Sequence, residues 1–350
     1  MQGLRVTLQD QKPEFLQSAM KRAHQLAVKK LREPHEVQNM MDRLIPDCKG
    51  EGVYQADVII EAITEKLEAK QALFTKLETQ AKPGAILATN TSTIRLEEIR
   101  QPMQNPKRLI GIHFFNPVAQ MPLVEVVHSD DTDESIVGAG LAFVKQINKL
   151  PLAVKSAPGF LVNRILLPYM LEAVSLLEEG VAGPVIDKAA MEFGMPMGPI
   201  ELADTVGLDV CLHALEKLAE SFGYVIPPIL REAVRQGTLG KKTGKGFYEY
   251  KDDKPIKEKV VDDFIPQDII DRLSLRMVNE SVACLREGIV KDADLLDAGT
   301  IFGCGFAPFR GGPIHYVRSS GFDVMRKQLE QLETRYGDRF QADRGWYDVA

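Results

Sequence analysis

The chain has 350 residues, of which 45% are hydrophobic and 26% are charged, an ordinary composition for a globular protein of two or three domains. Its net charge of −6 argues against a nucleic-acid-binding surface, and no stretch approaches the roughly 18 uninterrupted apolar residues of a membrane span. The four cysteines are scattered without a CxxC pair, so the sequence suggests neither a metal site nor a disulfide framework and favours a cytoplasmic location.

In chain order, hydrophobic periodicity predicts alternating strands and helices through the first 155 residues. Strands are expected at residues 4–9, 57–62, 84–89, 109–115, 123–128 and 152–155, and helices at residues 13–31, 66–80 and 134–148. This alternation predicts a mostly parallel α/β sheet. Such a sheet binds its ligands at the carboxyl ends of its strands.

Polar residues lie at or just after the ends of four predicted strands. They are Asp10, the segment Glu61–Glu65, the segment Asn90–Ser92 and the segment His113–Asn116. Because the carboxyl ends of parallel strands share one edge of a sheet, we expect these residues to form a single ligand site.

The segment Gly111–Pro117 and the carboxylate of Glu125 suggest a catalytic base. Two neighbouring strands would bring His113 and Glu125 within hydrogen-bond reach, and a histidine oriented by a carboxylate can remove a proton from a hydroxyl. The alternative is a core histidine bonded to backbone, with Glu125 on a solvated strand face. The position of His113 among the other polar strand ends favours the catalytic interpretation.

The pattern changes after Pro158. Residues 160–350 show long helical periodicities and few strand signals, which predicts an all-α domain. The segment Gly237–Tyr250 is rich in glycine and lysine but lacks the GxxxxGK[ST] spacing of a phosphate-binding loop. We therefore expect it to be a surface loop.

The helical part contains an internal repeat with a period of about 108 residues. The first copy includes Asn163-Arg164, Glu172-Ala173-Val174, Leu177-Glu178-Glu179-Gly180 and Phe193-Gly194. The second copy has Asp271-Arg272, Glu280-Ser281-Val282, Leu285-Arg286-Glu287-Gly288 and Phe302-Gly303 at nearly the same spacing. The two blocks are expected to pack as a pseudo-symmetric pair, and any polar role of Asn163 belongs to the first copy alone.

Four motifs in combination resemble the L-3-hydroxyacyl-CoA dehydrogenases, over essentially the whole chain. The motifs are Asn90-Thr91-Ser92, Gly111–Pro117, Leu123–Val126, and Pro158–Arg164 with Pro168-Tyr169. The doubled helical block looks most like the dehydrogenase part of the multifunctional fatty-acid oxidation alpha subunits, in which the second copy substitutes for a dimer partner.

By this resemblance the chain would use NAD to oxidise an L-3-hydroxyacyl-CoA in fatty-acid β-oxidation. His113 would be the base and Glu125 its orienting partner, while Ser92 and Asn163 would bond the substrate oxygen. The resemblance assigns cofactor contacts to Asp10, Glu65, Lys70, Ser92 and Asn116. A solvated helix lysine remains the alternative for Lys70. Phe302 stands where relatives can carry a substrate-contacting tyrosine.

The resemblance also implies a domain plan and a partner. Residues 1–155 would form a Rossmann-type NAD-binding domain, residues 156–251 the first helical copy and residues 262–350 the second. The multifunctional members work with a thiolase beta subunit, which would be the partner here.

In the family, a strand, a GxGxxG turn and a helix precede the strand that ends at Asp10, and no GxGxxG occurs in this sequence. The expected fold is therefore a Rossmann-type domain without its first strand, glycine turn and helix, followed by the two helical units. We expect such an N-terminally truncated chain to bind NADH poorly and to show little activity alone. The alternative function is a non-catalytic scaffold unit of a β-oxidation complex.

Overall fold

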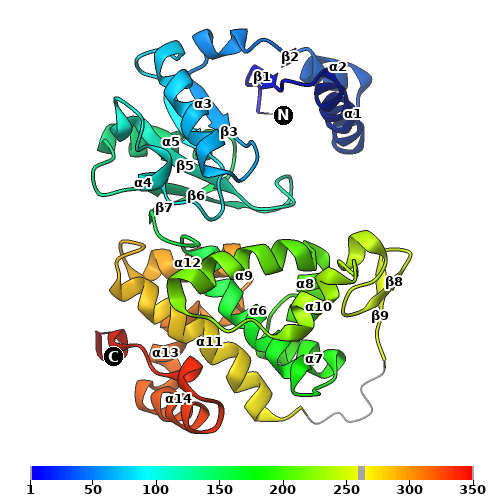
Figure 1. Cartoon of the computed structure of the whole chain (residues 1–350), viewed down its shortest axis with the longest axis vertical. Helices are drawn as coiled ribbons and strands as arrows, with labels where there is room; N and C mark the ends of the chain where they lie inside the picture. Colours follow the sequence, from blue (N-terminus) through cyan, green and yellow to red (C-terminus); the bar gives the residue numbers. More distant parts are fainter. Residues whose placement is uncertain (1, 259–264, 349–350) are drawn as a thin grey trace.

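The computed structural model describes residues 2–258 and 265–348. The chain forms a sheet-containing half followed by a helical half (Figure 1). The predicted α/β domain followed by an α domain is thus confirmed. No helix in the described residues is long and apolar enough to cross a membrane.

The N-terminal segment forms a small unit of its own. Its elements are β1 (Val6–Gln9), α1 (Pro13–Lys30), α2 (Pro34–Met41) and β2 (Leu44–Asp47). β1 pairs with β2 in parallel, and these two strands form a sheet separate from the main one. Helix α1 buries only Leu16 and Ala27, whereas its large apolar residues Phe15 and Leu26 are exposed.

A five-stranded sheet forms the centre of the first half, with strand order β3-β4-β5-β6-β7. Its strands are β3 (Val58–Glu61), β4 (Ile86–Thr89), β5 (Leu109–Phe114), β6 (Leu123–His128) and β7 (Leu150–Lys155). The connecting helices are α3 (Leu67–Gln80), α4 (Leu96–Ile99) and α5 (Glu134–Gln146). All neighbouring pairs are parallel except β5 and β6, which are antiparallel. Val144 of α5 packs on Ile110 and Val126 of one sheet face, whereas Phe74 of α3 joins the core on the other.

The helical half contains nine α-helices in the described residues. They are α6 (Val162–Glu178), α7 (Gly183–Phe193), α8 (Pro199–Val206), α9 (Leu208–Phe222), α10 (Pro228–Arg235), α11 (Gln267–Arg286), α12 (Ala293–Cys304), α13 (Pro313–Ser320) and α14 (Phe322–Tyr336). The expectation of a purely helical domain was wrong in one detail. Strands β8 (Glu249–Lys251) and β9 (Lys254–Ile256) form a hairpin that begins within the last two residues of the segment Gly237–Tyr250, which was expected to be a surface loop.

The two repeats pack against each other through α6 and α11, as the repeated motif predicts. The first copy was expected to end at residue 251. The β8–β9 hairpin continues past this limit, because Lys251 of β8 pairs with Lys254 of β9. The expected limits of the second copy, residues 262 and 350, lie outside the described residues.

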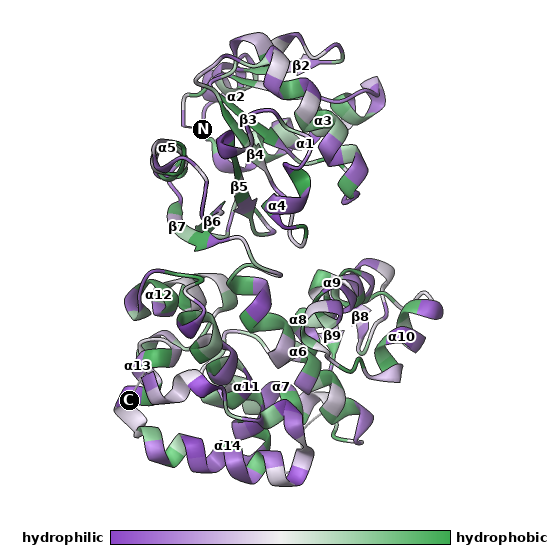
Figure 2. Cartoon of the chain, turned by 60° about the vertical axis from the view of Figure 1, so that its left-hand side comes forward, coloured by the Kyte–Doolittle hydropathy of each residue, from purple (hydrophilic) through white to green (hydrophobic). Residues whose placement is uncertain are grey.

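One apolar core joins the two halves, and it includes Leu123 and Val154 of the sheet together with Leu161 at the start of α6. Figure 2 shows hydrophobic residues concentrated on the inner strands and on the inward faces of the helices. Helix α12 also contacts this junction, where Gly299 approaches Leu152 and Gly303 approaches Leu123 too closely for a Cβ atom to fit without movement. The sheet edge and the start of α6 are therefore packed together.

Candidate active site

His113 and Glu125 are directly opposite each other on the antiparallel strands β5 and β6. Their side chains share one face of the sheet, and His113 Nδ1 lies 2.7 Å from Glu125 Oε2. The exposed fractions are 3% for His113 and 0% for Glu125, so the pair is shielded from solvent. The prediction that the two groups lie within hydrogen-bond reach is confirmed.

The second oxygen of Glu125 bonds the helical half of the molecule. Oε1 accepts hydrogen bonds from the backbone N–H groups of Leu161 at 3.0 Å and Val162 at 2.9 Å, where α6 begins. These are unpaired donors of a helix start, and the positive end of the helix dipole favours a carboxylate there. Both oxygens of Glu125 are thus occupied, and the orientation of His113 depends on both halves of the chain.

The other ring nitrogen of His113 faces Ser92 and Asn163, the two residues predicted to bond the substrate oxygen. His113 Nε2 lies 3.2 Å from Ser92 Oγ, and Asn163 Nδ2 donates to the Ser92 carbonyl oxygen at 3.5 Å. The structure therefore brings His113, Glu125, Ser92 and Asn163 into one cluster. With Nδ1–H donating to Glu125, Nε2 is free to accept a proton.

Two aromatic rings hold the imidazole in place. Phe115 and Phe160 each make an edge-to-face contact with His113, at centroid distances of 4.6 and 5.5 Å. Phe160 adopts a φ of 50°, a left-handed conformation that bulky residues rarely take. Such strain persists only where the surroundings enforce it, and here it lies directly before the two N–H groups that Glu125 accepts.

Glu65 and Lys70, two of the predicted cofactor residues, belong to one polar network beside Ser92, in which Lys70 is buried and Glu65 reaches the surface. Lys70 is only 1% exposed, so the alternative of a solvated helix lysine is wrong. Its Nζ lies 2.7 Å from Glu61 Oε1 and 3.2 Å from Glu65 Oε2. Burial alone would raise the pKa of Glu65, but the Thr91 hydroxyl and the Lys70 charge outweigh burial and hold that pKa below its usual value.

Asn116, Asp10 and Phe302 lie at the margins of this cluster or away from it. Asn116 is exposed just beyond β5, in a cis peptide bond with Pro117. Asp10 follows β1 of the separate small sheet, and its Oδ1 accepts the Lys12 N–H at 2.9 Å. Phe302 is 45% exposed on α12, one residue before the glycine that packs on the start of α6.

Sequence reasoning singled out the segments that contain Glu61, Phe160, Leu161 and Val162, but it gave none of these residues a role of its own. The position of Glu61 at the end of β3 placed it in the expected ligand site, but gave no indication of its contacts. The Phe160 conformation and the two backbone donors have no signature in residue type.

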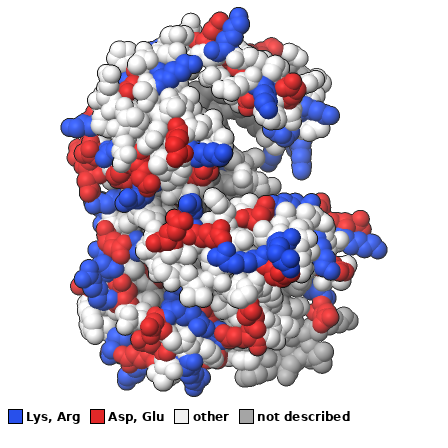
Figure 3. All heavy atoms as spheres, in the orientation of Figure 1, with Lys and Arg blue, Asp and Glu red and all other residues white. Residues whose placement is uncertain are grey.

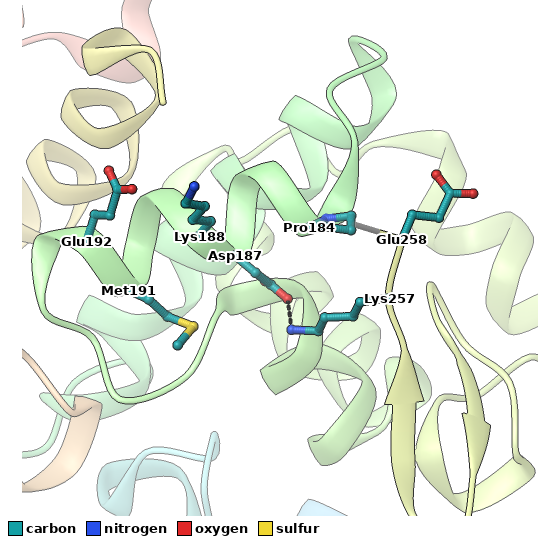
Figure 4. Close-up of a pocket in the computed structure, with 7 residues that line it drawn as sticks. All are labelled: Pro184, Asp187, Lys188, Met191, Glu192, Lys257 and Glu258. Atoms are coloured by element: carbon teal, nitrogen blue, oxygen red, sulfur yellow. Dashed lines mark hydrogen bonds and ion pairs between the residues drawn. The ribbon is translucent and has the colours of Figure 1, made fainter. Parts of the chain in front are cut away.

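A pocket in the first helical copy is distinct from this cluster (Figure 4). It lies along α7, where buried Asp187 accepts hydrogen bonds from Ile200 N–H, Tyr248 Oη and Lys257 Nζ. These bonds tie α7 to α8 and to the β8–β9 hairpin, so Asp187 has a structural role.

On the molecular surface, Figure 3 shows acidic and basic side chains interspersed over the visible face, with a hollow between the N-terminal segment and the helical half.

Two family descriptions match the chain. Residues 1–157 match "3-hydroxyacyl-CoA dehydrogenase, NAD binding domain", and residues 159–250 match "3-hydroxyacyl-CoA dehydrogenase, C-terminal domain". The fatty acid oxidation complex subunit alpha of Vibrio campbellii is 39% identical over 295 residues, which cover 81% of this chain and 42% of that protein. The chain thus spans about half the length of the curated relatives that it matches.

Solved structures show the same similarity. The 3-hydroxybutyryl-CoA dehydrogenase of Escherichia coli K12 is 26% identical, with a TM-score of 0.88 over 99% of this chain and 93% of that chain. The (S)-3-hydroxybutyryl-CoA dehydrogenase PaaH1 of Ralstonia eutropha is 33% identical, with a TM-score of 0.66 over 71% of this chain and 92% of that chain.

Proposed function

The chain belongs to the 3-hydroxyacyl-CoA dehydrogenase family, and we propose that it oxidises L-3-hydroxyacyl-CoA to 3-ketoacyl-CoA with NAD in fatty-acid β-oxidation. The observation that supports this function most directly is the position of His113, between the carboxylate of Glu125 and the hydroxyl of Ser92. A base with this arrangement suits the removal of a hydroxyl proton.

In the proposed mechanism, His113 Nε2 takes the proton of the substrate hydroxyl. The imidazolium formed in this way is stabilised by Glu125, whose charge is held in place by the start of α6. Ser92 Oγ and Asn163 Nδ2 donate hydrogen bonds to the reacting oxygen and stabilise the charge that develops there. NAD, when bound, supplies the acceptor for the hydride that leaves C3 of the substrate.

The residues that we propose to hold NAD are Asp10, Glu65, Lys70, Ser92 and Asn116. Ser92 is half-buried beside His113 Nε2 and Asn116 is exposed just beyond β5, which suits contacts with a nicotinamide ring that must approach the reacting carbon. Asp10 follows the end of β1, and a carboxylate at this position bonds ribose hydroxyls and repels the additional phosphate of NADP. We propose that the exposed ring of Phe302 contacts the acyl-CoA substrate.

The proposal extends to a thiolase beta subunit as partner and to the cytoplasm as location. The names of relatives up to 39% identical, which describe alpha subunits of a complex, support a partner subunit. Scattered cysteines without a disulfide pattern support a reducing compartment.

The test is reduction of acetoacetyl-CoA, followed through the loss of NADH absorbance. It uses the 350-residue chain and a fusion in which a strand, glycine turn and helix from a relative precede it. We expect turnover in the fusion, and its loss when His113 is changed to Gln. If both proteins fold but neither reduces acetoacetyl-CoA, the proposed reaction is wrong and the scaffold function is favoured.

A further inference from the structure

A buried lysine connects two glutamates next to the proposed active site. Lys70 lies in the first turns of α3, and its ammonium contacts Glu61 Oε1 and Glu65 Oε2. A buried charge is costly unless it is paired, and Glu61 would be an isolated buried anion without this lysine. The ammonium thus fixes the positions of both carboxylates relative to α3.

Glu65 holds the turn that contains Ser92. Its Oε1 accepts hydrogen bonds from the Thr91 hydroxyl, from Ser92 N–H at 3.2 Å, and from the Thr93 N–H and hydroxyl at 3.3 and 3.1 Å. One carboxylate oxygen therefore collects the polar groups of three consecutive residues. A displacement of Glu65 would release the backbone on both sides of Ser92.

Glu61 holds the strand that leads into the same turn. Its Oε2 accepts the Thr89 hydroxyl at 2.7 Å, and Thr89 Oγ1 in turn accepts the Thr91 N–H at 3.2 Å. Its Oε1 also accepts Ile63 N–H at 2.7 Å, in the loop that leads to Glu65. The segment 89–93 is thus fastened at its start by Glu61 and along the turn by Glu65, with Lys70 between the two carboxylates.

We infer that Glu61, Lys70 and Glu65 act together as positioning residues that hold Ser92 Oγ against His113 Nε2. This inference rests on the proposed function. It gives Glu61 a role at the site and gives Glu65 and Lys70 one in addition to any contact with the cofactor. The polar chain runs from α3 through the turn to Ser92, and from there to His113 and Glu125. Because donors at a reacting oxygen must be placed accurately, a loosened turn lowers turnover.

The inference predicts energetic coupling between Lys70 and Ser92. In whichever of the two proteins described above, the 350-residue chain or the fusion, reduces acetoacetyl-CoA, Lys70→Met should lower kcat by about 10- to 100-fold, a scale usual for a displaced catalytic group. In a Ser92→Ala background the same change should lower kcat by less than about 3-fold, because the group that Lys70 positions is gone. Lys76→Met, on an exposed lysine of the same helix, is the matched control and should leave kcat unchanged.

Other roles of Lys70 give different results. If Lys70 acts only through a cofactor contact, Lys70→Met raises the KM for NADH equally in both backgrounds and leaves kcat intact. If its role is only structural, the variant unfolds at lower temperature while the folded fraction keeps its full kcat. Either result would overturn the inference. An inactive parent enzyme would count against the proposed function and not against the positioning role. Amide hydrogen exchange, which requires no enzymatic activity, then tests the positioning role by itself.

Amide hydrogen exchange tests the positioning role directly on the 350-residue chain. We expect Lys70→Met and Glu61→Gln to speed exchange at Ser92 and Thr93 by at least about 10-fold, because Glu65 is held less firmly once the Lys70 ammonium, or the buried carboxylate that fixes it, is removed. Exchange at the strand amides of β6 should not change. If Lys70→Met does not fold, Glu61→Gln, which keeps the shape of the side chain, decides the question. Unchanged exchange at Ser92 and Thr93 in a folded variant would contradict the inference.

Discussion

Arg164 and Arg272 occupy equivalent positions in α6 and α11, and each guanidinium pairs with two glutamates on the facing copy of the repeat. Arg164 contacts Glu280 at 2.8 Å and Glu287 at 2.5 Å. Arg272 contacts Glu172 at 2.5 Å and Glu179 at 2.6 Å. The exchange of partners is reciprocal, as expected for two copies related by a pseudo-twofold axis.

Removal of one arginine from this arrangement should destabilise the helical half strongly. Arg164→Met removes a buried guanidinium and leaves Glu280 with only the Tyr224 hydroxyl as partner, so we expect a loss of about 3 kcal/mol in the free energy of unfolding. Urea denaturation measures the change. Arg235→Met serves as the control, because the Arg235–Glu232 pair is exposed and should contribute no more than about 1 kcal/mol. Equal losses in the two variants would contradict the role of the buried pair.

Loss of the base should abolish most of the turnover without unfolding the protein. In the 350-residue chain or the fusion, whichever reduces acetoacetyl-CoA, His113→Gln should lower kcat by about 100-fold or more, a usual scale for a lost acid–base group. His128→Gln is the matched control, since His128 is a histidine of β6 that contacts the Ser129 carbonyl oxygen. A His113→Gln variant that retains parental kcat would disprove the assignment of the base.

The two copies of the repeat should respond differently to the same change. Asn163→Ala should lower turnover, because Asn163 lies at the Ser92 turn. Asp271→Ala, at the equivalent position, should not, because Asp271 bonds Gln267 and Gln328 of the second copy. Steady-state kinetics of both variants provide the comparison, and equal losses would exclude a one-copy role for Asn163.

The stability contributed by Glu65 should disappear in acid. The pKa of Glu65 is lower in the folded chain than the ordinary value of 4.5, so folding favours its ionised form. This stabilisation is fully present above the unfolded pKa and is lost as the pH falls through the folded pKa. The difference in unfolding free energy between the parent and Glu65→Gln should therefore be largest near neutral pH and shrink below about pH 4.5. Denaturation curves across this pH range measure the difference in unfolding free energy. A difference that does not depend on pH would contradict the lowered pKa of Glu65 in the folded chain.

The amino-acid sequence was sufficient to identify most elements of the sheet and the residues of the proposed site. Alternating apolar runs predicted β3 to β7 to within a few residues, because strand and helix periodicities reflect local burial. The prediction omitted α2 and β2, since the four residues of Leu44–Asp47 include a proline and show no clear alternation. Residue type at strand ends singled out His113 and the segment Asn90–Ser92, and the carboxylate inside the run Leu123–Val127 supplied Glu125 as the partner of His113. The roles of Ser92 and Asn163 came from the family resemblance.

Only the tertiary structure decided how those residues meet. The antiparallel register of β5 and β6 places His113 opposite Glu125, and the start of α6 supplies the backbone donors for the second carboxylate oxygen. The same packing brings Asn163 to a turn 71 residues earlier in the chain. It also buries Lys70, a residue type that is otherwise mostly exposed. Local sequence patterns report the average environment of a segment, whereas these contacts depend on the relative placement of distant segments, which is set when the whole core packs.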